Sequence, residues 1–514
     1  MLISTKHKKI VLNLRNPDRV LTVIPTAKAF EYKGHTLVAV PHKQDEVRVL
    51  RNLGIEAPGP IRHYYPFPGR FRPFSAQLDT CEFMSMHSRA FVLNDMGTGK
   101  TMSTLWAFDY LRSIGQANKA LVISPLSTLE RTWGDEIFRN FPHLTFATLH
   151  GTRDKRLKLL NNDSFDVYII NHDGIKTAGF VEALKARDDI DTIVVDELSA
   201  FRTSGTDRFK SLKKIVQNRR VWGLTGTPIP NGPTDAWAQC VLINPDRVPK
   251  YFGKFRDAVL KQIGPFKWVP RESALEIVRE AMQPAIRFKR DECVDLPPTV
   301  YATRHAPLSD EQKAAYKEMV KQLKTEYEGG QILAVNEAVK FSKLLQICCG
   351  VAYANGEEIV IPHASRMSVV EEVVEEAGTK VIIFVPFTGS LNHIAEQLSK
   401  TTTVAVIDGS VSKSARDIIF RDFQDAENPR VIVAQPAAMS HGLTLTAAST
   451  IIWYAPITSN EIYLQANARI VRPGQKHSQL IVNIEGSEVE RKLYARLEGK
   501  QKQQGTLLDM LKDL

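Results

Sequence analysis

A short glycine-rich segment contains the residues with the clearest chemical use. Residues 91–101, FVLNDMGTGKT, form an apolar run that enters a glycine turn and ends in Gly-Lys-Thr, where a helix is expected to begin. Glycines at this spacing let main-chain N–H groups converge on phosphate oxygens, and a helix N-terminus adds favourable partial charge. Lys100 would neutralise the β- and γ-phosphates, and the Thr101 hydroxyl would ligate Mg²⁺. The segment predicts a nucleotide site formed by Met96, Gly97, Thr98, Gly99, Lys100 and Thr101.

Two adjacent carboxylates end another apolar run. Residues 193–195 are Ile-Val-Val and lead directly into Asp196 and Glu197. Adjacent acids at the end of a buried strand need a partner, because removing charge from water is costly. A magnesium–nucleotide complex would supply that partner, with Asp196 in the Mg²⁺ shell and Glu197 polarising the attacking water. Taken alone, the pair is also compatible with a simple acidic cap at a strand end.

The elements that position these residues are expected to be parallel strands crossed by helices. From about residue 71, short apolar runs alternate with longer amphipathic stretches, in two series. The first series predicts strands at 91–93, 121–124, 167–170, 193–195 and 221–224, and the second at 381–385, 403–407, 431–434, 451–454 and 480–483. Between about 230 and 365 the periodicity is helical, with Ser309 as a helix cap before residues 311–312. The pattern predicts an α/β chain with two lobes on parallel sheets and a helical insertion between them.

The expected domain boundaries divide the chain into four parts. They are a small basic N-terminal domain at 1–70, a first lobe at 71–285, a helical linker or protrusion at 286–365, and a second lobe at 366–514 with a bracing helix at 488–500. Residues 1–70 have strand-like runs at 10–14, 20–25 and 36–40, and they hold twelve Lys and Arg against five Asp and Glu. Most of the chain's formal charge of +10 is therefore local to this segment. A basic surplus favours a polyanionic partner, nucleic acid before an anionic membrane, although a solvated tail would have the same composition.

Composition excludes several other classes. Hydrophobic residues make up 43% and charged residues 24%, which is typical of folded domains rather than of disordered, collagenous or coiled-coil chains. Five scattered cysteines without a Cys-x-x-Cys pair argue against a disulfide framework or a zinc site. The N-terminus has no apolar signal core, and no apolar run approaches the ~20 residues of a membrane helix. We expect a protein of the cytoplasm, either of a bacterium or of a phage-infected host cell.

The order of motifs resembles that of superfamily 2 helicases and translocases with DEAD/DEAH-type motor lobes, specifically the Swi/Snf-like branch. The resemblance spans about residues 71–500. Its motifs are RPFSAQ at 72–77, the glycine-rich loop, ISPL at 123–126, the acidic pair, LTGTPIPN at 224–231, VIIF at 381–384, IDGS at 407–410, residues 434–445, and QANARIVRPGQ at 465–475. The resemblance implies two tandem RecA-like P-loop lobes, and the short insertions are most similar to minimal phage or bacterial members.

The resemblance also implies roles for further residues. Gln77 would read adenine, since its amide offers a donor and an acceptor together. Arg469 and Arg472, three residues apart and expected on one helical face, would complete the phosphate site from the second lobe when the lobes close. Thr225, Thr227 and Gln475 would couple the lobes. Phosphate contacts to DNA are expected from Pro125, Leu126, Ser127, Gln435, Ser440, His441 and Thr444.

The chain departs from the family pattern at several positions. The strict phosphate-loop pattern has glycine at the position of Asn94. Leu198-Ser199 follows the acidic pair where the family usually has a small residue and histidine, and Asn171-His172 stands where Thr-Tyr or Ser-Tyr is common. Thr444 replaces a frequent asparagine. The departures at 171–172, 198–199 and 444 concern the details of DNA contact rather than ATP hydrolysis.

The resulting expectation is an ATP- and Mg²⁺-dependent motor that translocates on DNA as a monomer, with protein partners not identified by the sequence. The preference for double-stranded or branched DNA comes from the resemblance alone. A strand-separating or branch-migrating helicase with residues 1–70 as a wedge, a motor on RNA, and a non-hydrolysing nucleotide-gated binding protein remain alternatives. The aromatic residues 63–65, between Arg62 and Arg70, either stack on bases or pack a hinge.

Overall fold

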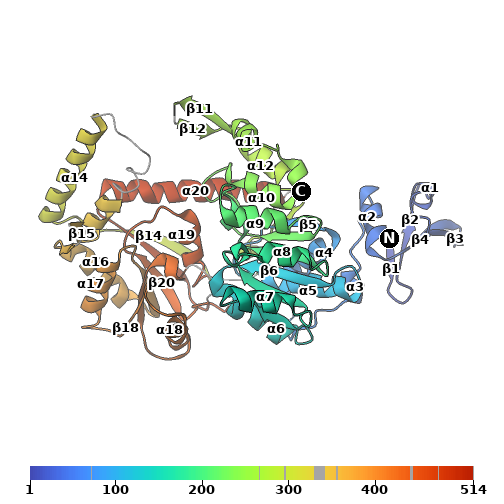
Figure 1. Ribbon diagram of the computed structural model, residues 1–514, viewed down its shortest axis with the longest axis horizontal. Coiled ribbons are helices and arrows are strands. Elements are labelled where there is room, and N and C mark those ends of the chain that lie inside the picture. The colour runs from blue at the N-terminus through green and yellow to red at the C-terminus, as the bar shows by residue number, and fades with distance from the viewer. Residues whose placement is uncertain are drawn as a thin grey trace. The chain divides into compact units, whose positions relative to one another are not determined.

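The chain folds into two α/β units, each with its own parallel sheet. The computed structural model describes residues 1–70, 72–265, 267–293, 297–328, 342–354, 357–439, 444–472 and 474–512. The first unit comprises Met1–Pro228, Pro233–Cys293 and Leu508–Leu514, and the second comprises Ile229–Gly232 and Val294–Leu507. Each unit is built around a parallel sheet flanked by helices (Figure 1), which confirms the predicted fold class of two tandem RecA-like lobes.

The first lobe is built on a seven-stranded parallel sheet with the order β13-β5-β10-β9-β6-β8-β7. All five strands of the first predicted series are present. The strands are β5 (Arg89–Val92), β6 (Lys119–Ser124), β7 (Phe146–Thr148), β8 (Val167–Asn171), β9 (Ile190–Asp196), β10 (Arg220–Leu224) and β13 (Ala285–Ile286). Because the strands are parallel, all their carboxyl ends lie at one edge of the sheet, where the predicted site residues follow.

Helices cover the sheet of the first lobe. They are α4 (Ser75–Met86), α5 (Lys100–Ser113), α6 (Asp135–Asn140), α7 (Arg153–Asn161), α8 (Phe180–Lys185), α9 (Asp207–Ile215), α10 (Asp235–Ile243), α11 (Phe252–Val259), α12 (Ala274–Ala281) and α13 (Arg290–Cys293). A core of fully buried side chains joins α4, α5 and α6 to one face of the sheet, with Trp106, Phe108 and Phe141 packed against Val122 and Val194. This burial fixes where α5 begins relative to the strand before it.

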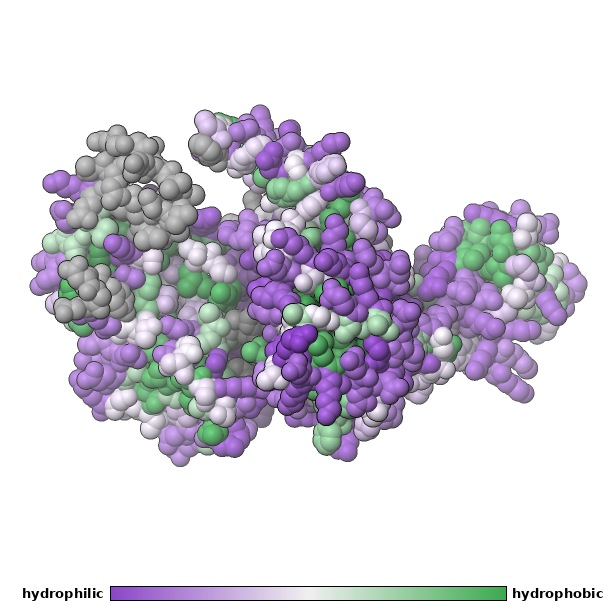
Figure 2. Space-filling view, viewed as in Figure 1, coloured by the Kyte–Doolittle hydropathy of each residue, from purple (hydrophilic) through white to green (hydrophobic). Residues whose placement is uncertain are grey.

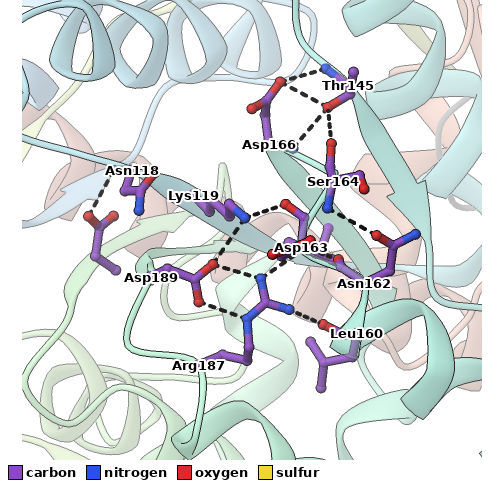
Figure 3. A network of polar contacts seen from close by, with 12 residues as sticks. Asn118, Lys119, Thr145, Leu160, Asn162, Asp163, Ser164, Asp166, Arg187 and Asp189 are labelled. Carbon is purple, nitrogen blue, oxygen red and sulfur yellow. Dashed lines mark hydrogen bonds and ion pairs between the residues drawn. The ribbon is translucent and has the colours of Figure 1, made fainter.

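Polar contacts fix the amino ends of the strands at the opposite edge (Figure 3). Lys119, which begins β6, is 3.1 Å from the Asp189 carboxylate, and Arg187 donates to both oxygens of that carboxylate at 2.7 Å. These two cations hold the pKa of Asp189 well below its usual range. Thr145 and Asp166 bind each other through side chain and main chain. These contacts hold the amino ends of neighbouring strands together, at the edge of the sheet opposite the predicted site.

The N-terminal domain is a four-stranded antiparallel sheet with the order β1-β2-β4-β3. Its elements are β1 (Leu2–Ser4), β2 (Lys9–Asn13), α1 (Asp18–Leu21), β3 (Lys28–Tyr32), β4 (His35–Pro41), α2 (Gln44–Asn52) and α3 (Ile61–Tyr64). The prediction of a strand at 20–25 is wrong. Helix α1 occupies its start, because Val20 and Ile24, four residues apart, both reach the small core of this domain.

Helix α4 attaches the N-terminal domain to the first lobe. Gln44 Nε2 donates to the Ser85 carbonyl and Arg48 Nε to the Met86 carbonyl, both at 3.0 Å, at the C-terminal end of α4. Arg51 and Arg62 form ion pairs with Glu82 on the same helix. The hydroxyl of Tyr65 donates to Asp109 at 2.6 Å, so this member of the aromatic segment 63–65 packs the hinge rather than projecting for base stacking.

The second lobe has a six-stranded parallel sheet with the order β14-β21-β20-β17-β19-β18. Its strands are β14 (Thr299–His305), β17 (Lys380–Phe384), β18 (Val404–Ile407), β19 (Val431–Ala434), β20 (Ala448–Trp453) and β21 (Gln479–Glu485). Its helices are α14 (Asp310–Glu328), α16 (Ala364–Glu376), α17 (Thr388–Leu398), α18 (Lys413–Asp425), α19 (Asn460–Asn467) and α20 (Glu488–Lys512). The second predicted series of strands is present in full.

A buried ion pair fixes α20 to the body of the second lobe, as the predicted brace requires. Arg366 Nη2 of α16 lies 2.7 Å from Glu490 Oε1 of α20, and the two side chains are 2% and 0% exposed. The other Glu490 oxygen accepts hydrogen bonds from Gly486 N and Ser487 Oγ, both at 2.9 Å. The first turn of α20 is therefore locked by charge and capping together.

Residues 230–365 contain more strand than their helical periodicity predicts. This stretch contains two hairpins, β11 (Leu260–Gly264) with β12 (Lys267–Pro270) and β15 (Val351–Ala354) with β16 (Glu357–Val360). Strand β13 belongs to the sheet of the first lobe, and β14 belongs to the sheet of the second. Strand β14 is an exposed edge strand, so it lacks a buried apolar run. Helix α14 does begin as expected, since Ser309 and Gln312 cap each other at 3.0 and 3.1 Å.

Hydrophilic residues cover most of the described surface on the face that Figure 2 shows. Among the helices that the structure describes, none combines the length and the apolar composition of a membrane span.

Candidate active site

The phosphate loop lies between β5 and α5, at the carboxyl edge of the first sheet. Gly97 and Gly99 both have φ of +82°, in the left-handed region that favours glycine. A Cβ at Gly99 would also lie 2.1 Å from Nε2 of Gln77, so a larger residue would displace that side chain. Helix α5 begins at Lys100 directly after this turn, so its unpaired first N–H groups lie at the loop. The other loop residues of the predicted site are Met96 and Thr98 in the turn and Thr101 in the first helical turn.

The Lys100 side chain folds back onto the loop. Its Nζ donates hydrogen bonds to the main-chain carbonyls of Asn94 at 2.8 Å and Asp95 at 3.0 Å. Burial lowers the pKa of Lys100, and the carboxylates of Glu197 and Asp196 oppose that shift. The ammonium group therefore lies within electrostatic reach of both acids, and loop carbonyls accept from two of its three N–H groups.

Asn94 explains the departure from the glycine pattern. Its backbone lies outside the left-handed region, so glycine is not required there. The buried side chain donates to Thr80 Oγ1 at 2.8 Å and accepts from Phe288 N at 2.9 Å. Asn94 therefore ties the start of the loop to α4 and to the segment after β13.

Asp196 is the last residue of β9, and three groups donate to its carboxylate. Trp133 Nε1 lies 3.0 Å and Ser124 Oγ 3.4 Å from Oδ2, and Glu197 N lies 3.1 Å from Oδ1. Burial raises the pKa of Asp196, while the Trp133 hydrogen bond and the charge of Lys100 oppose the rise. The carboxylate is therefore a desolvated but oriented acceptor, the state that suits a cation ligand.

Glu197 has a left-handed backbone conformation, with φ of 52° and ψ of 55°. This conformation costs a non-glycine residue about 1–2 kcal/mol. It turns the chain sharply at the end of β9, before the short helix Leu198–Phe201. Such strain is typical of functional positions, where the surrounding structure fixes a geometry that the residue alone would avoid.

Sequence patterns did not reveal Trp133 or His172. Trp133 is fully buried and lies in a six-residue π-helix, Leu129–Gly134, an irregular turn that is frequent at functional sites. His172 is 2.8 Å through Nε2 from the Asp196 carbonyl, and burial lowers the pKa of this histidine to about 4. The neutral ring therefore donates to the turn that carries the acidic pair. A single tryptophan belongs to no sequence motif that would predict a role for Trp133. The only sequence signal for a role of His172 was its departure from the family pattern.

The Gln77 side chain reaches the loop, but its amide group is hydrogen-bonded to main-chain groups. Its Oε1 accepts from Phe74 N at 2.9 Å, and its Nε2 donates to the Thr98 carbonyl at 3.3 Å. The side chain thus joins the first turn of α4 to the phosphate loop. Adenine recognition by Gln77 stays a prediction.

The Thr225-Gly226-Thr227 turn lies against the phosphate loop. Thr227 N donates to Thr225 Oγ1 at 3.1 Å, and an added Cβ at Gly226 would lie 3.4 Å from the Asn94 carbonyl oxygen. The buried Thr227 hydroxyl makes no hydrogen bond with any residue that the structure describes. A rearranged or ligand-bound loop would therefore find an available hydroxyl here.

The donor set at this edge fits Mg²⁺ that arrives with phosphate. Magnesium is usually held by one or two carboxylates together with substrate phosphates and water, and Asp196 and Thr101 supply a carboxylate and a hydroxyl. The described residues contain no cluster of three or more metal-ligating side chains, so a cage made by protein alone is absent from that part of the chain.

The DNA-contact candidates of the first lobe follow β6 directly. Pro125 is buried, whereas Leu126 is 52% exposed and Ser127 is exposed. The exposed pair is therefore accessible to a ligand at the carboxyl edge.

In the second lobe, Arg469 and Arg472 do not lie on one helical face. Helix α19 ends at Asn467, so both arginines lie in the turns after it. Arg469 is 2% exposed, and Arg472 donates through Nη1 to Thr444 Oγ1 at 3.2 Å and through Nε to the Ala468 carbonyl at 3.0 Å. The expected helix periodicity is broken because the segment turns back toward β21.

The glutamine candidates of the second lobe differ in how their amides are used. Gln475 donates to the carbonyls of Ala448 and Ile470 and accepts from two following N–H groups, so its amide is fully used within the lobe. Gln435 donates to Thr388 Oγ1 at 2.9 Å. Gln465, 1% exposed in α19, makes no side-chain hydrogen bond to any described residue, and no role was predicted for it. Ser440 and His441 lie outside the described residues.

Comparison with family models identifies the class of protein. Residues 77–351 match the SNF2-related domain, and residues 365–474 match the helicase conserved C-terminal domain. The first match alone covers more than half of the 514 residues, so the chain belongs to the SNF2-related family of ATP-dependent helicases and translocases. The motif order predicts this branch correctly.

Individual relatives share about a quarter of their residues with the chain. It is 27% identical over 385 residues to putative protein p41 of Acyrthosiphon pisum secondary endosymbiont phage 1, covering 71% of this chain and 80% of that protein. It is 27% identical over 437 residues to the putative ATP-dependent helicase/translocase YwqA of Bacillus subtilis, covering 80% of this chain and 46% of that protein. The chain thus spans less than half the length of the larger relative. The SWI2/SNF2 ATPase core of Sulfolobus solfataricus in complex with dsDNA is similar at 24% identity and a TM-score of 0.42, covering 87% of this chain and 94% of that one.

Proposed function

We propose that the chain is an ATP- and Mg²⁺-dependent motor that translocates along double-stranded DNA. The observation that carries the proposal is the cluster at the carboxyl edge of the first sheet, where the Lys100 ammonium lies in the field of Asp196 and Glu197 beside a left-handed glycine turn. A cation, two acids and a helix N-terminus in one place form the set that phosphoryl transfer from a nucleotide needs.

The geometry supports a distinct role for each residue. Lys100 would exchange its two loop carbonyls for the phosphate oxygens of ATP, which better satisfy its charge. Asp196 and Thr101 would hold Mg²⁺, which neutralises charge on the phosphates when bound. Glu197, directed by its strained backbone, would orient and polarise the attacking water. Arg469 and Arg472 would supply further positive charge from the second lobe.

Coupling of hydrolysis to movement would pass through the turn that contacts the loop. Gly226 of this turn lies close to Asn94 and Met96, so a change at the phosphates would alter the conformation of the turn. Gln475 would contribute from the second lobe. Binding of DNA through Ser127, Gln435, Thr444 and neighbouring loop residues would be independent of base sequence, because it uses phosphate contacts.

The substrate is tested by steady-state ATP hydrolysis with no nucleic acid, linear duplex, single-stranded DNA, forked DNA and RNA at one fixed salt concentration. Stimulation by plain duplex is the expected result. Stimulation by RNA alone, or no stimulation by any nucleic acid, would overturn the proposal. The phage and bacterial relatives support a place in the cytoplasm of a bacterium or a phage-infected cell.

One observation favours a second candidate, a helicase that separates or branch-migrates strands at forks and junctions. A wedge must be rigidly attached to its motor, and the N-terminal domain is anchored to α4 by buried hydrogen bonds and ion pairs. In the same assay, stimulation confined to forked or single-stranded DNA would select this candidate over duplex translocation.

A further inference from the structure

A basic pocket lies at the edge of the first lobe opposite the phosphate loop. It has a volume of about 640 Å³ and is lined by Arg48, Met86, His87, Ser88, Arg89, Gln116, Arg220 and Asn244. The lining contains three guanidinium groups and no carboxylate. Its size falls within the ~300–1,000 Å³ range of small-ligand sites.

The fold itself brings two of the arginines together. Arg89 begins β5 and Arg220 begins β10, and these neighbouring parallel strands pair with Val221 opposite Arg89. Arg48 comes from α2 of the N-terminal domain and is held by its bond to the Met86 carbonyl. The pocket is therefore a joint product of the N-terminal domain and the first lobe.

The three arginines differ in how far the protein satisfies them. Arg89 donates to the carbonyls of Ile243 and Val216 at 2.9 Å, so it has a structural role. Arg48 pairs with Asp45 at 2.8 Å, on the exposed side of α2. Arg220 lies over the Trp222 ring, but its buried Nη1 has no hydrogen-bond partner among the described residues. Arg220 Nη2 donates to the Gln116 carbonyl at 3.5 Å, so Nη1 is the buried donor of this guanidinium for which the described residues supply no acceptor.

Electrostatics point the same way. Burial lowers the pKa of Arg220, Asp191 opposes that shift, and the nearby Arg48 adds to it. Burial also lowers the pKa of Arg89, and the charge of Asp246 opposes that shift. These carboxylates and Asp45 lie outside the lining, so the pocket surface itself carries three guanidinium groups and no negative charge. An anion in the pocket would offset the repulsion between these groups.

We propose that this pocket binds a phosphate group, carried either by the DNA backbone or by a free phosphorylated molecule. A terminal or free phosphate offers three oxygens to several planar guanidinium forks, and a backbone phosphodiester offers two non-bridging oxygens that different forks can share. The His87 ring keeps its Nδ1 on the Phe83 carbonyl at 2.8 Å, which fixes this wall of the pocket. The proposal does not depend on ATP hydrolysis or on the choice of DNA substrate.

The test is thermal unfolding of the full chain in sodium phosphate against sodium chloride at equal ionic strength. All variants have Lys100→Ala, which removes the phosphate affinity of the glycine loop. Phosphate should raise the Tm of this background by about 5 °C at a concentration of about 100 times its Kd. Adding Arg220→Gln should abolish most of the rise, whereas adding Arg19→Gln, an exposed charge outside the pocket, should leave it intact. Equal rises in all three proteins, or no rise in any, would overturn the proposal.

A second variant covers the case in which Arg220→Gln does not fold. Arg48→Gln changes a partly exposed residue of α2 and should give the same loss of phosphate response. The source of the phosphate is distinguished by duplex binding as a function of salt. A backbone phosphate in the pocket lowers the log–log slope by about 0.9 in Arg220→Gln relative to Arg19→Gln. An equal slope together with a lost thermal response assigns the pocket to a free phosphorylated molecule.

Discussion

The indole nitrogen of Trp133 donates a 3.0 Å hydrogen bond to Oδ2 of Asp196, so a buried tryptophan orients the carboxylate that is proposed to hold Mg²⁺. The two residues are 63 positions apart in the chain. The bond also opposes the rise in the pKa of Asp196 that burial causes. It therefore favours the ionised form of a desolvated carboxylate and fixes its orientation.

Trp133→Phe should lower ATP hydrolysis at limiting Mg²⁺ by about tenfold or more, because a hydrogen bond to a charged group contributes about 1.5–3 kcal/mol. Measurement of the hydrolysis rate against Mg²⁺ concentration checks this. The matched control is Trp222→Phe, which removes a buried indole N–H from the His87 carbonyl in the same lobe. Equal Mg²⁺ dependence in the two variants would contradict the assigned role.

Glu197→Gln should still bind ATP but hydrolyse it at least about 100-fold more slowly, since a positioned general base contributes about 10²–10⁴ in rate. Single-turnover hydrolysis and binding of a fluorescent ATP analogue separate the two steps. Hydrolysis at the wild-type rate would show that another group activates the water.

Glu197→Gly should stabilise the fold by about 1 kcal/mol while abolishing hydrolysis, because glycine relieves the left-handed backbone at this position. Urea unfolding measures the change. Glu197→Ala is the control, as it removes the same carboxylate but keeps a Cβ in the strained region. If glycine and alanine give equal stability, the backbone is not strained here.

The buried His172 makes stability depend on pH. Its pKa is lowered from 6.5 to about 4, so between these pH values His172 is protonated in the unfolded chain and neutral in the folded chain. Stability is therefore fully present above pH 6.5 and is lost as pH falls from 6.5 through 4, by about 3 kcal/mol for this group. His172→Gln keeps an N–H donor for the Asp196 carbonyl and should lose less stability over that range in urea titrations. Parallel losses in both proteins would rule out His172 as the titrating group.

Glu490→Gln should destabilise the second lobe by about 3–5 kcal/mol, because it leaves the buried Arg366 without its counter-charge. Glu488→Gln, two residues earlier on α20 and exposed, is the matched control and should produce no measurable change in urea unfolding. Equal stability of the two variants would mean that groups other than Glu490 compensate the charge of Arg366.

The ten strands of the two predicted series could be predicted because each is a run of apolar residues, which are wholly or mostly buried in nine of them and mostly half-buried in the edge strand β18. Strand β14 could not, since it is a polar edge strand whose place depends on pairing with β21, some 180 residues away. The same distinction holds for the site. The loop glycines and the acidic pair have local patterns, whereas Trp133 and His172 reach Asp196 only through the packing of separate strands and turns. Helix α19 ends before Arg469 because the chain turns there, which three-residue spacing does not show.

Helix α4 has a mechanical consequence for the N-terminal domain. Its first turn is bonded to the phosphate loop through Gln77, and its last residues, Ser85 and Met86, hold the N-terminal domain through Gln44 and Arg48. A twelve-residue helix is a stiff rod of about 18 Å. A displacement of the loop on nucleotide exchange would therefore be transmitted along α4, and the N-terminal domain would move as a lever arm with the phosphate loop.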